Sequence, residues 1–372
     1  MAEDHRLHSL DGFRALAITL VIGFHYFVRW APPFSSSPLY PYGSRAAGIA
    51  IFRYGYLGVE LFFVISGFVI SMTLFRSSDL GNFARKRFAR LFPTMLLCST
   101  ITFFVLQILP QTAFQVSWAD FLPSLTFTDP VLWNKVMQHG VRAMDGSYWS
   151  LFEEVKFYFW ISLLYFSFRG QNFFHKVGIA FALLVGILTV IRVYGLPHQW
   201  IIEFLFTAKY LPWFVTGIGF FALYREPSSR IGWILLAESA GAIVVHAITE
   251  SANLTPEAVA LTMSDALFFA LLYKPHWLSP FAARPVAAIG MASYSLYLLH
   301  QDAGVALLQL LSRSPFWRQN PGISFFATGA IILIMTTVSL IVYRYWEAPA
   351  KTLILGYRFA KASPPNRAPG PL

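Results

Sequence analysis

The chain has 372 residues, of which 56% are apolar and 17% aromatic, whereas only 12% carry a charge. A soluble globule needs more charged surface than this composition supplies, so the sequence excludes a soluble domain and predicts a polytopic membrane protein. The formal charge is +10. Since the sequence offers no compact basic domain that would hold a nucleic-acid duplex, we assign this excess charge to contact with anionic lipid.

Apolar windows long enough to cross about 30 Å of hydrocarbon recur along the chain. Ten are predicted, near residues 10–30, 54–75, 91–110, 148–168, 176–193, 204–223, 231–249, 257–273, 286–310 and 322–345. The fold class expected is an all-α integral membrane protein, a bundle of about ten transmembrane helices that forms one domain over residues 1–361. The Pro-rich tail, 362–372, lacks apolar periodicity and is expected to be disordered.

The placement of Lys and Arg predicts the orientation of these spans. If the N-terminus is inside, the inner loops hold most of the basic residues, including the dense run Arg85, Lys86, Arg87 and Arg90. Because positive residues concentrate on the cytoplasmic side of membrane proteins, both termini are expected to be cytoplasmic.

Ionisable residues inside predicted spans are candidates for a functional site. Arg14 and His25 lie in the first window, Glu60 in the second, Glu154 in the fourth and His300 in the ninth. At about 1.5 Å of rise per residue, the last four reach a similar depth. This coincidence favours a shared polar cavity over the alternative, in which each is an isolated, hydrogen-bonded interior residue.

Several segments match known sequence motifs. The chain opens with LDGFRALA, with ten residues between Arg14 and His25, and continues with GVELFFVISGFVI, RKRFARLFP, YWSLFEEVKFYFW, SYSLYLLH and RYWEAPAK. In this order, over nearly the whole chain, these segments resemble the motifs of the acyltransferase-3 family of integral membrane acyltransferases. The chain departs from the family pattern at Val155 and Lys156, where acidic or Gln residues are usual. Lys156 either alters acceptor preference or pairs with Glu153.

The resemblance implies transfer of an acyl group, most often acetyl from acetyl-CoA, to a hydroxyl of a carbohydrate or glycosylated acceptor. Imidazole accepts a proton near neutral pH, so His25 is the expected general base, with Glu154 as its partner. The residues expected at the donor are Arg14, Lys86, Arg87, Arg90, Ser66 and Gly67. Those expected at the acceptor or in the cavity are Glu60, Trp149, Ser150, Tyr297 and His300.

Direct transfer is preferred to an acyl-enzyme on Ser66, Ser150 or His25. The histidines show no metal-ligand spacing and no P-loop or dinucleotide fingerprint occurs, so we expect no metal and no bound cofactor; acyl-CoA enters as a substrate.

Two other functions stay open: a proton-coupled transporter and a non-catalytic membrane scaffold. Transporters tend to consist of two related halves, and no such internal similarity is visible in this sequence. We expect a standalone enzyme in the plasma membrane of a bacterium, without predicting its acceptor, acyl chain length or oligomeric state.

Overall fold

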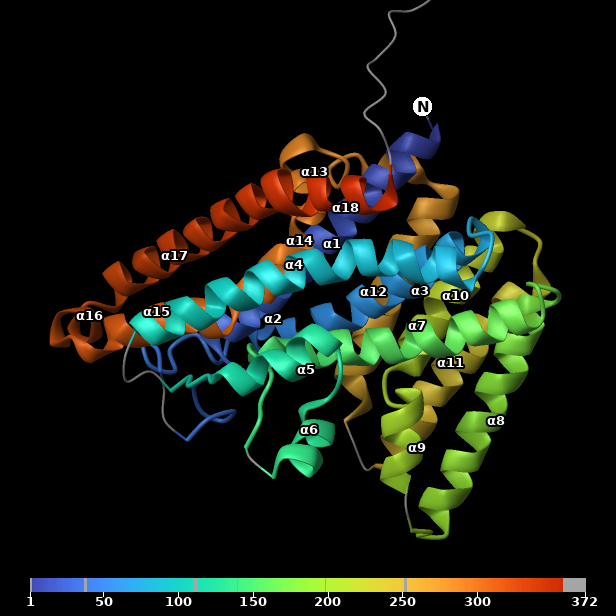
Figure 1. Cartoon of the computed structure of the whole chain (residues 1–372), viewed down its shortest axis with the longest axis horizontal. Coiled ribbons are helices and arrows are strands. Elements are labelled where there is room, and N and C mark those ends of the chain that lie inside the picture. Colours follow the sequence, from blue (N-terminus) through green and yellow to red (C-terminus); the bar gives the residue numbers. More distant parts are fainter. Residues whose placement is uncertain are drawn as a thin grey trace, which may run out of the picture.

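The computed structural model describes residues 2–36, 39–109, 113–138, 140–197, 199–250 and 253–356. Over these residues the chain is helical and contains no strand, as predicted (Figure 1). The predicted disordered tail, 362–372, lies outside the described residues.

Within the described part of the chain, eight helical segments are long and apolar enough to cross a membrane. They are His8–Phe27 of α1 (Ala2–Phe27), Gly55–Phe75 with α3 (Gly58–Phe75), α4 (Leu80–Ile108), α8 (Phe173–Val193), Gln199–Arg225 with α9 (Gln199–Phe206) and α10 (Leu211–Arg225), α11 (Arg230–Thr249), α12 (Leu254–Tyr273), and Pro321–Leu355 with α17 (Pro321–Val342), a π-helical turn (Tyr343–Glu347) and α18 (Ala348–Leu355).

The other two predicted windows are helical but differ from a simple apolar span. Helix α7 (Trp149–Ser167) is 19 residues long and carries Glu153, Glu154 and Lys156 near its start. The window at 286–310 is divided into α13 (Arg284–Met291), α14 (Ser293–His300) and α15 (Asp302–Arg313). The multi-pass helical fold is therefore confirmed, while the count of about ten spans and the cytoplasmic termini stay predictions.

Short helices gather at the end of the bundle where α1 finishes, which we call the loop-rich end (Figure 1). They are α2 (Ala50–Arg53), α5 (Phe121–Thr126), α6 (Pro130–Met137) and α16 (Pro315–Gln319). One-turn 3-10 helices lie at Gly55–Leu57, Trp118–Asp120, Gly146–Tyr148 and Pro275–Leu278. The start of α1 and the end of α18 lie together at the opposite end, which we call the terminal end.

Helices α3 and α10 pack with their backbones in close contact near the centre of the bundle. A Cβ atom added at Gly67 of α3 would lie 2.0 Å from the backbone oxygen of Phe214, and one added at Gly217 of α10 would lie 2.1 Å from that of Val64. Small residues permit such close approach between membrane helices. This contact fixes α3, the helix that carries one wall of the candidate site.

The chain breaks its helical path between α14 and α15, directly after His300. At Gln301 the backbone has φ −76° and ψ −78°, and α15 starts at Asp302. The buried carboxylate of Asp145 accepts a hydrogen bond from the Asp302 backbone N–H (2.8 Å) and two from Ser147. The Asp145 carboxylate thus accepts a hydrogen bond from a backbone N–H in the first turn of α15, where the N–H groups have no acceptor within the helix.

Candidate active site

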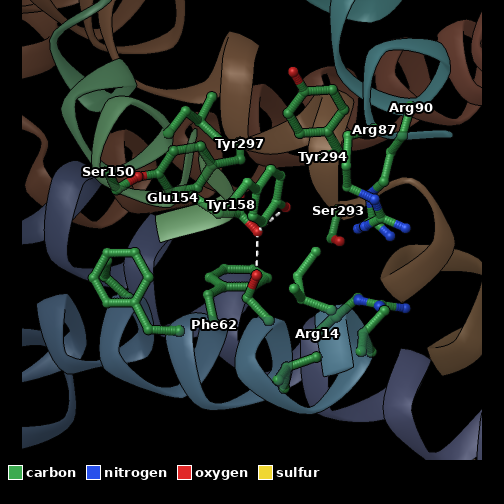
Figure 2. Close-up of a pocket in the computed structure, with 17 residues that line it drawn as sticks. Arg14, Phe62, Arg87, Arg90, Ser150, Glu154, Tyr158, Ser293, Tyr294 and Tyr297 are labelled. Carbon is green, nitrogen blue, oxygen red and sulfur yellow. Dashed lines mark hydrogen bonds between the residues drawn. The ribbon is translucent and has the colours of Figure 1, made fainter. Parts of the chain in front are cut away.

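One polar pocket lies inside the bundle, between α1, α3, α4, α7 and the α13–α14 segment (Figure 2). It encloses about 640 Å³ including its open mouth. Its polar lining consists of Arg14, Ser66, Arg87, Arg90, Ser150, Glu154, Tyr158, Ser293, Tyr294 and Tyr297. Seven residues predicted from the sequence therefore meet in one place: Arg14, Ser66, Arg87, Arg90, Ser150, Glu154 and Tyr297.

The arginines lie together on one side of this pocket, opposite Ser150 and Tyr297 (Figure 2). Arg14 Nη1 pairs with Asp11 Oδ1 at 2.6 Å, and Arg87 Nη2 donates to Thr73 Oγ1 at 2.9 Å. Three guanidinium groups and one carboxylate line the pocket, and Asp11 pairs with one of the guanidinium groups, which leaves an excess of one positive charge. A partly desolvated group of arginines is suited to bind phosphate through charge-assisted, bidentate hydrogen bonds.

Glu154 is held by two hydroxyl groups. Its Oε1 accepts hydrogen bonds from Ser66 on α3 and from Tyr158 Oη at 2.5 Å (Figure 2). Tyr158 received no role from the sequence, although it stands four residues after Glu154 and hence on the same helix face. That spacing is the signal that could have identified it.

Ser150 and Tyr297 form the hydroxyl side of the pocket. The Tyr297 hydroxyl donates its single hydrogen to the Ser147 carbonyl at 3.0 Å, so the Ser150 hydroxyl is the donor in the 2.7 Å contact with Tyr297. Both hydroxyls are thereby fixed in position beside the pocket.

The two histidines form a pair next to Tyr297. His25 Nδ1 lies 3.0 Å from His300 Nε2, and His300 Nδ1 lies 2.7 Å from the Tyr297 carbonyl oxygen. His300 is fully buried, whereas His25 is half-buried. The partner found for the His25 ring is His300, and the predicted partner, Glu154, bonds to Ser66 and Tyr158 instead.

The two histidines do not line the arginine pocket, and four further predicted residues also lie elsewhere. Lys86 donates to the Arg76 carbonyl (2.8 Å) at the end of α3, and Gly67 faces α10. Trp149 is 39% exposed and contacts Phe63, a lining residue of the pocket, with ring centroids 6.4 Å apart. Glu60 lines a different cavity. The expected common cavity is thus divided.

Lys156, where the chain departs from the usual motif, pairs with Glu153 at 2.7 Å and also donates to the Phe204 carbonyl at 2.9 Å. These contacts bear out the predicted pairing. Among the described residues, no group of three or more His, Cys, Asp or Glu side chains is arranged to hold a metal ion.

The chain thus has a central polar pocket with clustered arginines inside a bundle of apolar helices. A family model of the acyltransferase domain matches residues 7–344. The chain belongs to the acyltransferase-3 family. No solved structure is detectably similar to it.

Named relatives are O-acetyltransferases. The O-acetyltransferase OatA of Staphylococcus aureus is 24% identical over 379 aligned positions, covering 93% of this chain and 57% of the relative. The O-acetyl transferase of Shigella phage Sf6 is 32% identical over 101 residues, 27% of either chain. The peptidoglycan O-acetyltransferase OatA of Listeria monocytogenes is 32% identical over 93 residues, covering 23% of this chain and 12% of the relative. The matches span about half or less of these relatives' lengths.

Proposed function

We propose that this protein is an O-acetyltransferase of the bacterial plasma membrane. It transfers acetyl from acetyl-CoA directly to a hydroxyl of a carbohydrate or glycosylated acceptor, with His25 as general base. Membership of the family and the names of the relatives support O-acetyl transfer, and the name of the Listeria relative supports a cell-envelope glycan as acceptor.

The observation that carries this proposal is the hydrogen-bond chain from His25 through His300 to the Tyr297 carbonyl. A carbonyl oxygen only accepts, so His300 Nδ1 bears a hydrogen and, in the neutral ring, His300 Nε2 is an acceptor. His25 Nδ1 then donates to it. The lone pair of His25 Nε2 is left available to take a proton from an acceptor hydroxyl.

The chemistry follows from this arrangement. As the sugar oxygen attacks the thioester carbonyl carbon, its proton passes to His25 Nε2. The carbon–sulfur bond then breaks, and the imidazolium returns the proton to the coenzyme A thiolate, so atoms and charges balance. His300 keeps the His25 ring in the required tautomer, the role that a triad's third member plays for its histidine.

The donor fits the arginine side of the pocket. Coenzyme A carries several phosphate charges, and Arg14, Arg87 and Arg90 provide the excess positive charge to meet them. The acetyl group would then point toward Ser150 and Tyr297. The Tyr297 ring lies next to His300, with centroids 5.4 Å apart, so the reacting end of the donor comes close to the histidine pair.

The test is acetyl transfer in proteoliposomes supplied with radiolabelled acetyl-CoA and a panel of envelope glycans. We expect the native chain to label a glycan, His25→Ala to lose about a hundredfold or more in rate, and Glu154→Gln to retain part of the activity. His276→Ala is the matched control, because His276 is exposed and makes only an edge contact with the Trp277 ring. Full activity in His25→Ala would overturn the assigned base. Proton-driven movement of a glycan without acetylation would favour the transporter instead.

A further inference from the structure

A second polar cavity lies near the loop-rich end, outside the pocket described above; we call it the Glu60 cavity. It is formed by α3, α8, α10, α11, α12 and the segment before α10, and encloses about 630 Å³ including its mouth. Its polar and aromatic lining is Glu60, Thr189, Arg192, Lys209, Tyr210, Trp213, His246 and Glu257. It shares no lining residue with the arginine pocket.

Two carboxylates reach this cavity from different helices with an oxygen left free. Glu60 comes from α3 and Glu257 from α12, and Oε2 of each is buried without a hydrogen-bond partner among the described residues. A buried acceptor without a partner loses its hydration and gains nothing in return, so it favours a ligand that brings donors. Lys209 adds a donor to the same cavity.

The other charged side chains at this cavity form ion pairs that connect the surrounding helices. Arg192 pairs with Glu203 at 2.5 Å and with Glu250 at 3.1 Å, and its Nη1 lies 3.1 Å from His246 Nδ1. These residues tie the end of α8 to α9 and α11. One side of the cavity is therefore cross-linked by ion pairs, while Glu60 and Glu257 approach from α3 and α12.

Aromatic rings separate this cavity from the arginine pocket. The Tyr210 ring lies 5.3 Å from Phe63 and 5.0 Å from Trp149, measured between centroids. Phe63 lines the arginine pocket, and Trp149 precedes Ser150. A ligand in the Glu60 cavity would thus lie one ring away from the proposed reaction site.

We infer that the Glu60 cavity binds a sugar ring of the acceptor, namely a ring that flanks the unit to be acetylated. Carboxylates accept hydrogen bonds from sugar hydroxyls, Lys209 donates to them, and the half-buried Tyr210 ring provides an apolar surface that the sugar's C–H groups contact. The aromatic partition places this ring beside the acetylated unit. The inference rests on the proposed function, which it extends by giving the acceptor an extended binding site.

A labelling experiment tests the cavity without relying on catalysis. Thr189→Cys places a thiol in the wall and leaves the carboxylates intact, and the native Cys98 is fully buried. A membrane-impermeant methanethiosulfonate reagent should modify this thiol. Addition of the oligosaccharide that the native chain acetylates, or a β-1,4-linked N-acetylglucosamine tetramer if it acetylates none, should slow modification at least about fivefold.

The protection should disappear when Glu60→Gln and Glu257→Gln are added to Thr189→Cys. A thiol that does not react, one that the sugar leaves unprotected, or one that sodium chloride alone protects would each overturn the inference. Absence of acetyl transfer together with sugar protection would instead contradict the proposed function, so the two failures can be told apart.

Kinetics give the second measurement. In the native chain the KM for a long acceptor should be lower than that for its single-unit fragment, and Glu60→Gln or Glu257→Gln should reduce this advantage by about tenfold, the effect typical of losing a hydrogen bond to a charged group. Glu238→Gln is the matched control, because Glu238 also has a buried, unpartnered Oε2 but does not line the cavity. An unchanged KM ratio in both cavity variants would count against the binding site.

Discussion

His300 uses both of its ring nitrogens, one toward His25 and one toward the Tyr297 carbonyl. No nitrogen is left to contact a substrate, so its role in the proposed reaction is to position the His25 ring and fix its tautomer. This separates the two histidines by function although they share one hydrogen bond.

Replacing His300 tests that separation. We expect His300→Ala to lower kcat by about tenfold to a hundredfold, because second-sphere partners of a functional imidazole have effects of that size, while the KM for acetyl-CoA stays near the native value. His300→Gln offers an amide oxygen to His25 Nδ1 and should restore part of the rate. Steady-state kinetics in proteoliposomes measure both. Equal kcat in the native and Ala chains would show that His25 needs no such partner.

At the level of single residues the sequence predicted much of the pocket. Arg14 and Glu154 could be picked out because ionisable groups are rare in membrane spans, and Arg87 and Arg90 because they belong to a dense basic run. All four meet in one pocket. The predicted depth in the membrane could not assign hydrogen-bond partners. It places His25 and Glu154 at one level but does not predict which helix faces are turned toward each other. The His25–His300 contact joins positions 275 residues apart, and no local pattern encodes it.

Among the helices, α3 has the least room to move, because one face contacts the α10 backbone and the other lines the arginine pocket. Its residues Ser66 and Gly67 are neighbours in sequence, yet they point to different surroundings: Ser66 bonds to Glu154, and Gly67 meets the Phe214 backbone. A small change at Gly67 therefore acts on packing first and on the pocket through it.

Gly67→Ala should destabilise the protein, because the added methyl would lie 2.0 Å from the Phe214 carbonyl oxygen and the helices would have to move apart. Overpacking of this kind costs about 1–3 kcal/mol, and the melting temperature in detergent should fall accordingly. Gly329→Ala is the control, since no atom lies within 4 Å of its added Cβ. Equal melting temperatures in both variants would contradict the close helix contact.

The α14–α15 break depends on Asp145, which lies outside the spanning helices. Burial raises the pKa of Asp145 to about 6, and hydrogen bonds from Ser147 and the Asp302 N–H oppose that rise. The neighbouring Asp302 carboxyl group, which accepts from Gln301 Nε2 at 2.8 Å, is the titratable group that faces it. The break after His300 is therefore sensitive to the protonation of one loop residue.

Stability should decrease as the pH rises through this range. The unfolded chain loses the Asp145 proton near pH 3.8 and the folded chain near pH 6, so folding stability falls between these values and the loss is complete above pH 6. The full effect is at most about 3 kcal/mol. Melting temperatures of the native chain and Asp145→Asn from pH 4 to pH 7 measure it. The difference between the two curves should change with pH, and parallel curves would refute the assignment.

Element boundaries were predictable where composition alone decides them. The long apolar helices α8, α11 and α17 lie within or close to their predicted windows. The window at 286–310 was predicted as one span because its apolar residues run without interruption. Its division at Gln301 comes from a hydrogen bond to Asp145, a residue more than 150 positions earlier, which hydropathy cannot reveal.

On the scale of the whole molecule, the loop-rich end and the terminal end differ in shape, because the loop-rich end carries the short helices α5 and α6. Arg225 and Arg230 flank the α10–α11 connection. That both termini are cytoplasmic stays a prediction of the positive-inside rule.

Cysteine labelling in intact cells tests the orientation. Val136 on α6 is 75% exposed, and Ser228 is exposed between α10 and α11. An impermeant thiol reagent should label Val136→Cys in intact cells and Ser228→Cys only after permeabilisation. The reverse pattern would invert the topology and place the arginine side of the pocket nearer the wrong compartment for coenzyme A.

The family motifs, read along the chain, predicted that distant segments would meet, and residues from five of them line or adjoin the arginine pocket. What the sequence could not predict was that the interior holds two hollows where one was expected. Glu60 lies only two residues before Phe62, yet they line different cavities, since side chains two positions apart on a helix point to nearly opposite sides.

The packed rings of Phe63, Trp149 and Tyr210 between these two cavities also bear on energy conservation in the cell. A single water-filled passage containing so many ionisable groups would conduct protons down the membrane potential. Two separate hollows interrupt such a passage, because an apolar barrier lies between them. Loosening that barrier, for instance by shrinking Tyr210, should therefore make the membrane leaky to protons, a cost to the host that has nothing to do with acetylation.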